Sequence, residues 1–194
     1  MRKLSEGAEA RVYLAKMFGS NVVVKVRHAK AYRIMELDEN LRRTRTRREA
    51  KAMVRASEAG VRVPELFALG EFSIYMEKVT GSLLKDARQR GRYGEIGRML
   101  AKMHGANVIH GDFTPANIMI TPSGPCVIDF GLSEISESAE GKAIDLLLMK
   151  RSIGDRDYRT LAEAYGSGYA GSKQIFSRLA DIEKRGRYQI RTLM

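Results

Sequence analysis

The sequence predicts an α+β fold in two lobes, in which a small antiparallel sheet with one main helix precedes a mostly helical part. Runs rich in β-branched residues occupy the first third of the chain, and apolar residues at helical spacing occupy most of the remainder. With 194 residues, 44% of them hydrophobic, the chain can bury a real core but is short for two full lobes, so we expect trimmed elements. We place the N-lobe at residues 1–79 and the C-lobe at residues 80–194.

The N-lobe is predicted from runs of strand-forming residues and one amphipathic stretch. The predicted strands cover residues 12–15, 22–26, 66–70 and 72–76. Residues 19–21, Gly-Ser-Asn, are a turn signal between the first two strands. Residues 47–56 have the apolar spacing of a helix, and Gly60 followed by Pro64 ends that helix.

The C-lobe is predicted to consist mainly of helices around one hairpin. The predicted helices cover residues 82–90, 93–106, 141–149, 155–165 and 171–185. The predicted hairpin has strands at 118–120 and 125–128, with a turn at 121–124. Asp145 is a charge on an apolar helix and needs hydrogen-bond donors, so we expect it to bind the backbone of the loop around Asp112.

The most specific pattern is the stretch 110–117, His-Gly-Asp-Phe-Thr-Pro-Ala-Asn, followed after the hairpin by Asp-Phe-Gly at 129–131. Protein kinases place an aspartate beside the attacking hydroxyl, in H-R-D-x-x-x-x-N, and hold Mg²⁺ with that asparagine and a second aspartate. Asp112, Asn117 and Asp129 fit these spacings. Asp-Phe-Gly alone could be a plain turn after a strand. The combined pattern predicts a reduced bilobal protein-kinase-like fold that uses ATP and Mg²⁺, with Asn117 and Asp129 as metal ligands.

Lys25 and Glu49 are the predicted lysine–glutamate pair of such a site. Lys25 lies among valines, where a lysine is costly unless a fixed anion meets it. The alternative is a lysine on an edge strand whose head reaches solvent. Glu49 lies in the middle of the predicted helix, one turn from the apolar Met53, which directs it to the core. Its competitors are Glu36, Glu39 and Glu58.

The remaining nucleotide contacts are predicted from position alone. Gly7 and Ala8 stand where a kinase has its glycine-rich phosphate cover, and such small residues partly meet the need for a close backbone approach. The full G-x-G-x-x-G is absent. The segment that leaves the sheet offers Met76, Glu77 and Val79 as adenine-binding candidates, although it could simply be a connector.

The charge of the chain predicts attraction to polyanions. The formal net charge is +11 and the isoelectric point is about 9.9, which favours nucleic acid as a partner without sequence selectivity. The charge is clustered at Arg42, Arg43, Arg45, Arg47 and Arg48, and again at Lys184, Arg185, Arg187 and Arg191. This clustering favours contact with RNA, tRNA included, through the basic C-terminal tail; a solvated basic surface is the alternative.

The sequence indicates a cytoplasmic protein that does not enter a membrane. No run of about 18 apolar residues occurs, and the first six residues are not continuously apolar, so we expect neither a membrane span nor secretion. The single cysteine, Cys126, lies in a predicted buried strand and has no metal-ligand spacing around it. A single buried cysteine without a disulfide partner fits a reducing compartment.

Nearly the whole chain resembles a known group, the small atypical serine/threonine kinases of the KEOPS complex (PRPK-type family), which take part in threonylcarbamoyladenosine modification of tRNA. Besides the stretches 110–112 and 129–131, the resemblance is carried by residues 7–10 (Gly-Ala-Glu-Ala), 30–33, 37–38, 47–49, 142–146 and 184–187. It implies that Lys25 and Glu49 pair, that Asp112 is the catalytic aspartate, and that Asn117 and Asp129 bind magnesium.

The resemblance also implies partners and activity. The larger lobe would dock on the threonylcarbamoyl-transferring subunit of the complex and the smaller lobe on a second small subunit. Similar members autophosphorylate and can act mainly as ATPases that support tRNA modification.

Three departures from ordinary protein kinases indicate a slow enzyme controlled by its partners. Gly111 replaces the arginine that would pair with a phosphorylated activation loop. Residues 132–140 are too few for a peptide platform, and no Ala-Pro-Glu follows. Thr114 and Pro115 replace the lysine-containing sequence typical of serine/threonine kinases.

Three other functions stay open. A small-molecule kinase of the aminoglycoside or choline type also uses His-Gly-Asp with a following asparagine, but normally needs a long helical insertion for which this chain has no room. A RIO-type kinase is another neighbour, but we find no additional N-terminal domain to support it. The third is a nucleotide-binding, RNA-contacting scaffold with little turnover.

Overall fold

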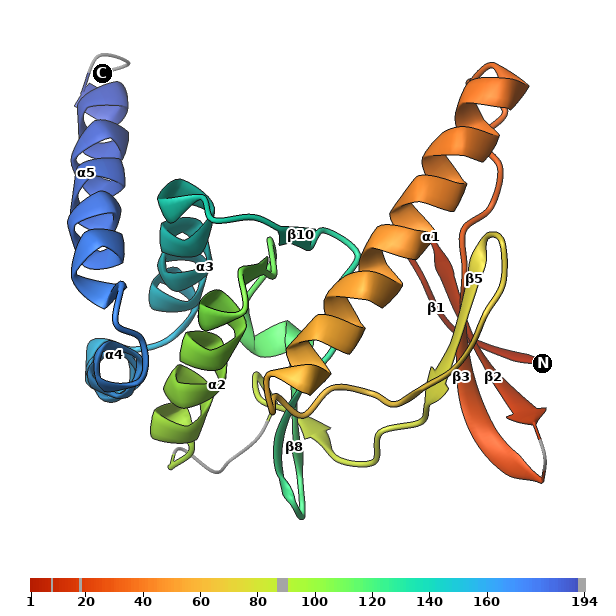
Figure 1. The fold of residues 1–194 in the computed structure, drawn as a ribbon, viewed down its shortest axis with the longest axis horizontal. Helices are drawn as coiled ribbons and strands as arrows, with labels where there is room; N and C mark the ends of the chain where they lie inside the picture. Colours follow the sequence, from red (N-terminus) through yellow and green to blue (C-terminus); the bar gives the residue numbers. More distant parts are fainter. Residues whose placement is uncertain (8, 18, 87–90, 192–194) are drawn as a thin grey trace.

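The first part of the chain folds into a five-stranded antiparallel sheet with one long helix beside it (Figure 1). The computed structural model describes the chain except for residues 8, 18, 87–90 and 192–194. The strand order is β1-β2-β3-β5-β4. The strands are β1 (Arg2–Glu6), β2 (Arg11–Met17), β3 (Ser20–Val26), β4 (Leu66–Leu69) and β5 (Ser73–Glu77). The predicted α+β fold with a small antiparallel sheet is confirmed.

All four strands predicted for this sheet are present, and one more precedes them. The sequence does not predict β1 because all five of its residues are exposed, so it lacks the hydrophobic alternation of a half-buried strand. It pairs with β2 at the edge of the sheet. Lys25 lies in β3, between β2 and β5, which excludes the edge-strand reading of this lysine.

The helix α1 (Met35–Glu58) is far longer than the predicted segment 47–56. Its N-terminal half has no apolar face that a sequence pattern could reveal. It is instead stabilised by ion pairs, such as Arg42 with Asp38 one turn earlier (2.6 Å) and Arg43 with Glu71 outside the helix. The predicted apolar face does exist in the C-terminal half, where Ala50, Ala52, Met53 and Ala56 are buried.

A three-stranded sheet opens the second part of the chain and corrects one prediction. Its strands are β6 (Ser82–Leu83), β8 (Ile118–Thr121) and β9 (Gly124–Val127), in the order β6-β8-β9. The helix predicted over 82–90 is wrong for its described part, because β6 pairs with β8 and residues 84–86 form a turn; 87–90 lie outside the described residues. A Cβ on Gly81 would lie 2.2 Å from the carbonyl oxygen of Ile120, so this close approach requires glycine.

The rest of the chain is helical, as predicted. The helices are α2 (Tyr93–Gly105), α3 (Ala139–Ser152), α4 (Asp155–Gly168) and α5 (Ser172–Arg191). A Cβ on Gly97 of α2 would lie 2.2 Å from the carbonyl oxygen of Leu161 in α4, so these two helices cross with their backbones close together. The predicted loop 132–140 contains the short strand β10 (Glu134–Ile135), which pairs with β7 (Val108–Ile109). The predicted lobe boundary, between residues 79 and 80, falls in the connection between β5 and β6.

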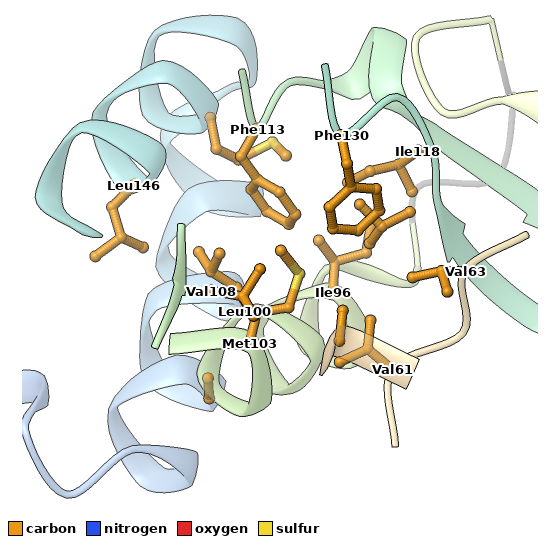
Figure 2. Packing of buried hydrophobic residues seen from close by; sticks show 14 of the residues in the cluster. Val61, Val63, Ile96, Leu100, Met103, Val108, Phe113, Ile118, Phe130 and Leu146 are labelled. Carbon is orange, nitrogen blue, oxygen red and sulfur yellow. The ribbon is translucent and has the colours of Figure 1, made fainter. Parts of the chain in front are cut away.

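One hydrophobic cluster includes the phenylalanines that follow the two predicted site aspartates (Figure 2). Leu100 and Met103 of α2 pack there with Ile118 of β8, and Phe113 and Phe130 enter the cluster from two loops. All five side chains are at most 1% exposed. The two phenylalanines directly follow Asp112 and Asp129 in the sequence, so their burial fixes the backbone that presents both carboxylates.

Two observations bear on the expected setting of the chain. Cys126 is a free thiol buried in β9, as predicted, and burial raises its pKa to about 12 because an apolar environment disfavours the thiolate. Across the residues that the structure describes, no helix combines the length and the apolar character that crossing a membrane requires.

Candidate active site

The catalytic-loop stretch 110–117 lies between β7 and β8 and ends in a 3-10 turn (Pro115–Asn117). His110 is buried, with its ring 5.0 Å from the ring of Phe130 and 5.8 Å from that of Phe113. Its Nε2 donates to the carbonyl oxygen of Ile128, 3.1 Å away, which ties this loop to the segment that carries Asp129. The histidine therefore couples the two acidic segments of the site.

Asp145 of α3 braces this loop, as predicted. One carboxylate oxygen accepts from the amide of Gly111 (2.9 Å), and the other accepts from the amide of His110 (2.7 Å) and from Nε2 of His104 (3.3 Å). Because a carboxylate only accepts, Nε2 of His104 carries the proton, and its Nδ1 accepts from the hydroxyl of Tyr165 at 2.8 Å. Burial lowers the pKa of His104, which keeps the ring neutral in this network.

Gly111 has a structural reason to replace the arginine of other kinases. Its φ is +79°, in the left-handed region that glycine adopts freely. A Cβ at this position would lie 2.4 Å from the carbonyl oxygen of Leu132. The turn that exposes its amide to Asp145 therefore excludes a side chain.

Asp112 and Asn117 are joined directly. The Nδ2 atom of Asn117 donates to the backbone oxygen of Asp112 (2.9 Å) and to its carboxylate Oδ2 (2.8 Å). Both partners are acceptors, so the amide must turn its nitrogen toward Asp112 and its oxygen away. The carbonyl oxygen of Asn117 accepts from the amide of Ile128 at 2.9 Å, which places Asn117 beside the residue preceding Asp129.

Lys25, Glu49 and Asp129 are brought together from three elements. Nζ of Lys25 lies 2.6 Å from Oε1 of Glu49 and 2.7 Å from Oδ1 of Asp129. The other oxygen of Glu49 accepts from Nη2 of Arg27, also at 2.6 Å. The structure thus brings together the predicted lysine and glutamate, and Glu49 rather than Glu36, Glu39 or Glu58 faces Lys25.

Asp129 is held in its ionised form. Burial alone would raise its pKa, but the charge and the hydrogen bond of Lys25, together with the amide of Gly131 at 3.2 Å, lower the pKa below its ordinary value. Its φ of +60° is uncommon for a residue other than glycine. The backbone of Asp129 therefore adopts an unfavourable conformation, and in this conformation the carboxylate faces Lys25.

The predicted Mg²⁺ ligands, Asn117 and Asp129, each have one side-chain oxygen that the contacts above do not use. Asn117 turns its Oδ1 away from Asp112. In Asp129, Oδ1 binds Lys25 and the amide of Gly131, and Oδ2 is the remaining carboxylate oxygen. Magnesium prefers such oxygen ligands and is usually held by one or two protein groups together with substrate phosphates. Within the described part of the chain, no group of three or more His, Cys, Asp or Glu residues could hold a metal by itself.

A cavity of about 400 Å³ joins these residues to the predicted phosphate cover. Its lining includes Gly7, Lys25, Arg27, Asp112 and Asp129. The amide of Gly7 donates to the carbonyl oxygen of Ala10 (2.9 Å), so the cover is a tight turn between β1 and β2. The predicted cover residue Ala8 lies outside the described residues.

The three adenine-binding candidates lie at the end of β5, outside the lining of this cavity. Met76 is buried in the sheet. The amide of Glu77 donates to the carbonyl oxygen of Glu65 (2.8 Å), and its carboxylate pairs with Arg62, which lowers the pKa of Glu77. Val79 is half-buried in the connection. Their contact with adenine stays a prediction.

Sequence reasoning missed Arg27 and a second cavity. Arg27 follows Lys25 by two positions, and the period of a strand places such residues on one face, so a signal was present. The second cavity, of about 700 Å³, lies on the other side of the catalytic loop and is lined by Thr114, Pro115, Ile153 and other residues. It depends on the approach of the α3–α4 junction, which no local pattern reveals.

Comparison with known proteins places this geometry in a family. The family model described as "RIO domain" matches residues 15–151. A probable serine/threonine-protein kinase BUD32 homolog of Archaeoglobus fulgidus is 38% identical, over 99% of both chains. The KEOPS complex subunit Bud32 of Pyrococcus abyssi is 33% identical, over 99% of this chain and 98% of that protein.

A longer relative contains this chain as one part. A probable bifunctional tRNA threonylcarbamoyladenosine biosynthesis protein of Methanothermobacter thermautotrophicus is 37% identical over 95% of this chain, which covers only 36% of that protein. Among solved structures, the Rio2 kinase of Chaetomium thermophilum has a TM-score of 0.63 at 18% identity, over 97% of this chain and 72% of that one. This likeness shows the kinase fold.

The RIO match corrects one argument from the sequence. The RIO type was set aside because no additional N-terminal domain was found, but the matched domain lies within residues 15–151 and needs no such addition. The full-length relatives at 33% and 38% identity agree with the expected resemblance. The chain belongs to the RIO domain family and, within it, to the Bud32 group of serine/threonine kinases.

Proposed function

We propose that the chain is an ATP- and Mg²⁺-dependent serine/threonine kinase or ATPase that serves a KEOPS-type complex in threonylcarbamoyladenosine modification of tRNA. The observation that supports the chemistry most strongly is the convergence of Lys25, Asp112 and Asp129 on one cavity, with Asn117 bonded to Asp112. These are the groups that phosphoryl transfer requires.

Each residue then has one task. Asp112 accepts the proton of the attacking hydroxyl or orients a water molecule, and its bond from Asn117 fixes the carboxylate while it does so. Lys25 holds the α- and β-phosphates, and Glu49 orients it. Asn117 and Asp129 would hold Mg²⁺, which neutralises phosphate charge when bound. Asp145 keeps the loop amides in place.

The test is phosphate transfer and hydrolysis with radiolabelled ATP. Asp112→Asn keeps the shape of the side chain but removes the base, so we expect turnover to fall about 100-fold or more. Asp181→Asn, on the exposed face of α5, is the matched control and should keep full turnover. Unchanged turnover in Asp112→Asn, in the presence of partner subunits, would contradict the role given to Asp112.

The two lobes are the proposed docking sites for different partners. Tyr32, Ile34 and Met35 are more than 75% exposed at the start of α1, which supports an apolar contact of the N-lobe with a small subunit. Leu132 and Ile144 are exposed in the C-lobe, on the proposed side of the threonylcarbamoyl-transferring subunit. Ile34→Asp should release only the small subunit in co-purification, and Leu132→Asp only the other.

Contact with tRNA is proposed for only part of the basic residues. Arg42, Arg43 and Arg45 of α1 are engaged in ion pairs within the chain, whereas Arg47 and Arg48 are exposed and make no ion pair with the described residues. These two arginines are therefore available to phosphate groups. In the basic tail, Arg185 binds Glu140 at 3.5 Å, and contact of the tail with tRNA rests on its charge alone. The proposal is narrower than the whole arginine block suggested by the sequence.

Salt dependence of tRNA binding tests this assignment. The double substitution Arg47→Gln/Arg48→Gln should weaken binding and reduce the slope of log affinity against log salt by about 1 to 2. Arg43→Gln is the control, because its guanidinium already binds Glu71, and should leave the slope nearly unchanged. Equal slopes for all three proteins would remove α1 from the tRNA surface.

A further inference from the structure

We infer that Arg27 is a positioning residue that holds Glu49, and with it α1, in place while Lys25 exchanges Asp129 for the phosphates of the nucleotide. The inference rests on the proposed function, since it concerns the same site. Arg27 is a buried cation for which the mechanism above has no task.

The cluster contains two cations for one buried glutamate. Glu49 is 2% exposed and Arg27 is 4% exposed. Oε1 of Glu49 binds Lys25 and Oε2 binds Arg27, each at 2.6 Å. The two carboxylate oxygens therefore have separate partners. Loss of one partner still leaves an ionic hydrogen bond to the other.

Lys25 has a second bond that the reaction must break. Its Nζ also donates to Oδ1 of Asp129 at 2.7 Å. Phosphate oxygens would take this donor, and Asp129 would turn to the metal. A lysine ammonium has three donors and a flexible stem, so its attraction to Glu49 weakens as it moves toward the phosphates. A buried carboxylate that lost its only cation would be strongly destabilised.

Arg27 is the more rigidly held of the two cations that bind Glu49. Its backbone amide donates to the carbonyl oxygen of Phe72 at 2.8 Å, which extends the pairing of β3 with β5 beyond the strand. Its guanidinium remains charged at any physiological pH and is planar, so it makes a directed bond to the carboxylate. Glu49 therefore keeps a partner that takes no part in nucleotide exchange.

Gly131 leaves space for Lys25, whereas Arg27 lies at an ordinary contact distance. A Cβ at this position would lie 3.1 Å from Nζ of Lys25 and 3.8 Å from Nη2 of Arg27. The glycine of Asp-Phe-Gly thus allows the lysine to pass between Asp129 and the cavity. The same cavity is lined by Arg27.

Hydrogen–deuterium exchange of the α1 amides around Glu49 tests the inference, with the nucleotide-free protein and with Mg²⁺ and the nonhydrolysable analogue AMP-PNP. Three variants are compared: Arg27→Met removes the fixed cation, Arg27→Lys keeps a charge, and Lys25→Met removes the mobile cation. Arg43→Met is the matched control, because Arg43 also lies in α1 but binds Glu71 and not Glu49.

We expect Arg27→Met to raise exchange around Glu49 by about tenfold or more, and Mg²⁺ with AMP-PNP to raise it further by drawing Lys25 away. Wild-type exchange should not rise with the nucleotide. Arg27→Lys should restore part of the protection, Lys25→Met should keep most of it, and Arg43→Met should leave the protection around Glu49 unchanged.

Two results would overturn the inference: Lys25→Met loosening α1 as much as Arg27→Met, or no change in Arg27→Met with and without the nucleotide. If Arg27→Met does not fold, the Lys25→Met protein alone decides. Exchange of the nucleotide-free protein does not depend on turnover. Failure of the proposed function in the Asp112→Asn test is therefore distinguishable from failure of this inference.

Discussion

Two acidic groups organise the site in opposite ways, Asp145 in the helical lobe and Glu49 beside the sheet. Asp145 is fully buried and accepts from three neutral donors, two loop amides and one histidine. Glu49 is equally buried but binds two cations, one of which also binds Asp129. The first network has no partner to exchange, whereas the second contains the lysine that we propose binds the phosphates.

The difference shows that the molecule has a rigid catalytic loop and a separate cluster of charges whose partners can change. The catalytic loop is fixed by the packing of Phe113 in the hydrophobic cluster (Figure 2) and by hydrogen bonds to Asp145, so the carboxylate of Asp112 stays in position. The Lys25 cluster faces a cavity and is built of charges, whose interactions can be redistributed when a charged ligand enters. Mutation of Asp145 should therefore lower stability and activity together, whereas mutation of Lys25 should lower mainly activity.

The largest expected effect is from Asp145→Ala. It leaves the amides of His110 and Gly111 without an acceptor, and each unsatisfied buried donor costs about 1 to 3 kcal/mol. We expect the free energy of unfolding to fall by about 3 kcal/mol, and turnover to fall with it because the loop around Asp112 loosens. Urea denaturation measures the loss of stability and an ATP assay measures turnover, with Asp181→Ala as the control. If the Asp145→Ala protein were as stable as the wild type, the hydrogen bonds from Asp145 to the loop would be dispensable.

Lys25→Met should affect activity without a comparable loss of stability. Removal of one electrostatic group at the reacting phosphates typically lowers turnover about 100- to 1000-fold. Glu49 keeps Arg27, and Asp129 is partly exposed, so we expect the free energy of unfolding to change by only about 1 kcal/mol. Lys51→Met on the exposed side of α1 should change neither quantity. A large destabilisation by Lys25→Met would show that this lysine is a structural group like Asp145 and not an exchangeable one.

The smallest expected effect is a pH dependence of stability from His104. Its pKa in the folded protein is lowered from 6.5 by burial, so below pH 6.5 the unfolded chain binds a proton that the folded protein does not. Stability from this group is thus complete above pH 6.5 and is lost as the pH falls below that value. His104→Gln keeps a donor for Asp145 and should flatten the change.

The measurement is urea denaturation between pH 7.5 and about 5.5, where most carboxylates stay ionised. His28 also has a pKa lowered by burial, so His28→Asn is the control that separates the two histidines. A pH profile unchanged in His104→Gln would show that the ring is not kept neutral by the fold.

The sequence alone determined the chemical identity of the site. The spacings of Asp112, Asn117 and Asp129 predicted a shared site, in which Asn117 binds Asp112 and both aspartates line one cavity. The apolar surroundings of Lys25 predicted a fixed anion that proves to be Glu49. The helices with an apolar face and the hairpin were also predicted, because hydrophobic periodicity is a local signal. The brace by Asp145 followed from the rule that a buried charge needs donors.

Only the tertiary structure decided the features that depend on distant partners. The first half of α1 is stabilised by ion pairs with residues such as Glu71, and β6 replaces a predicted helix because β8 offers it a partner. Arg27 was not recognised because its ion pair with Glu49 forms only when the fold brings α1 to the end of β3. Local patterns report which surfaces are apolar, but contacts between charges or backbones are set by the closure of the fold.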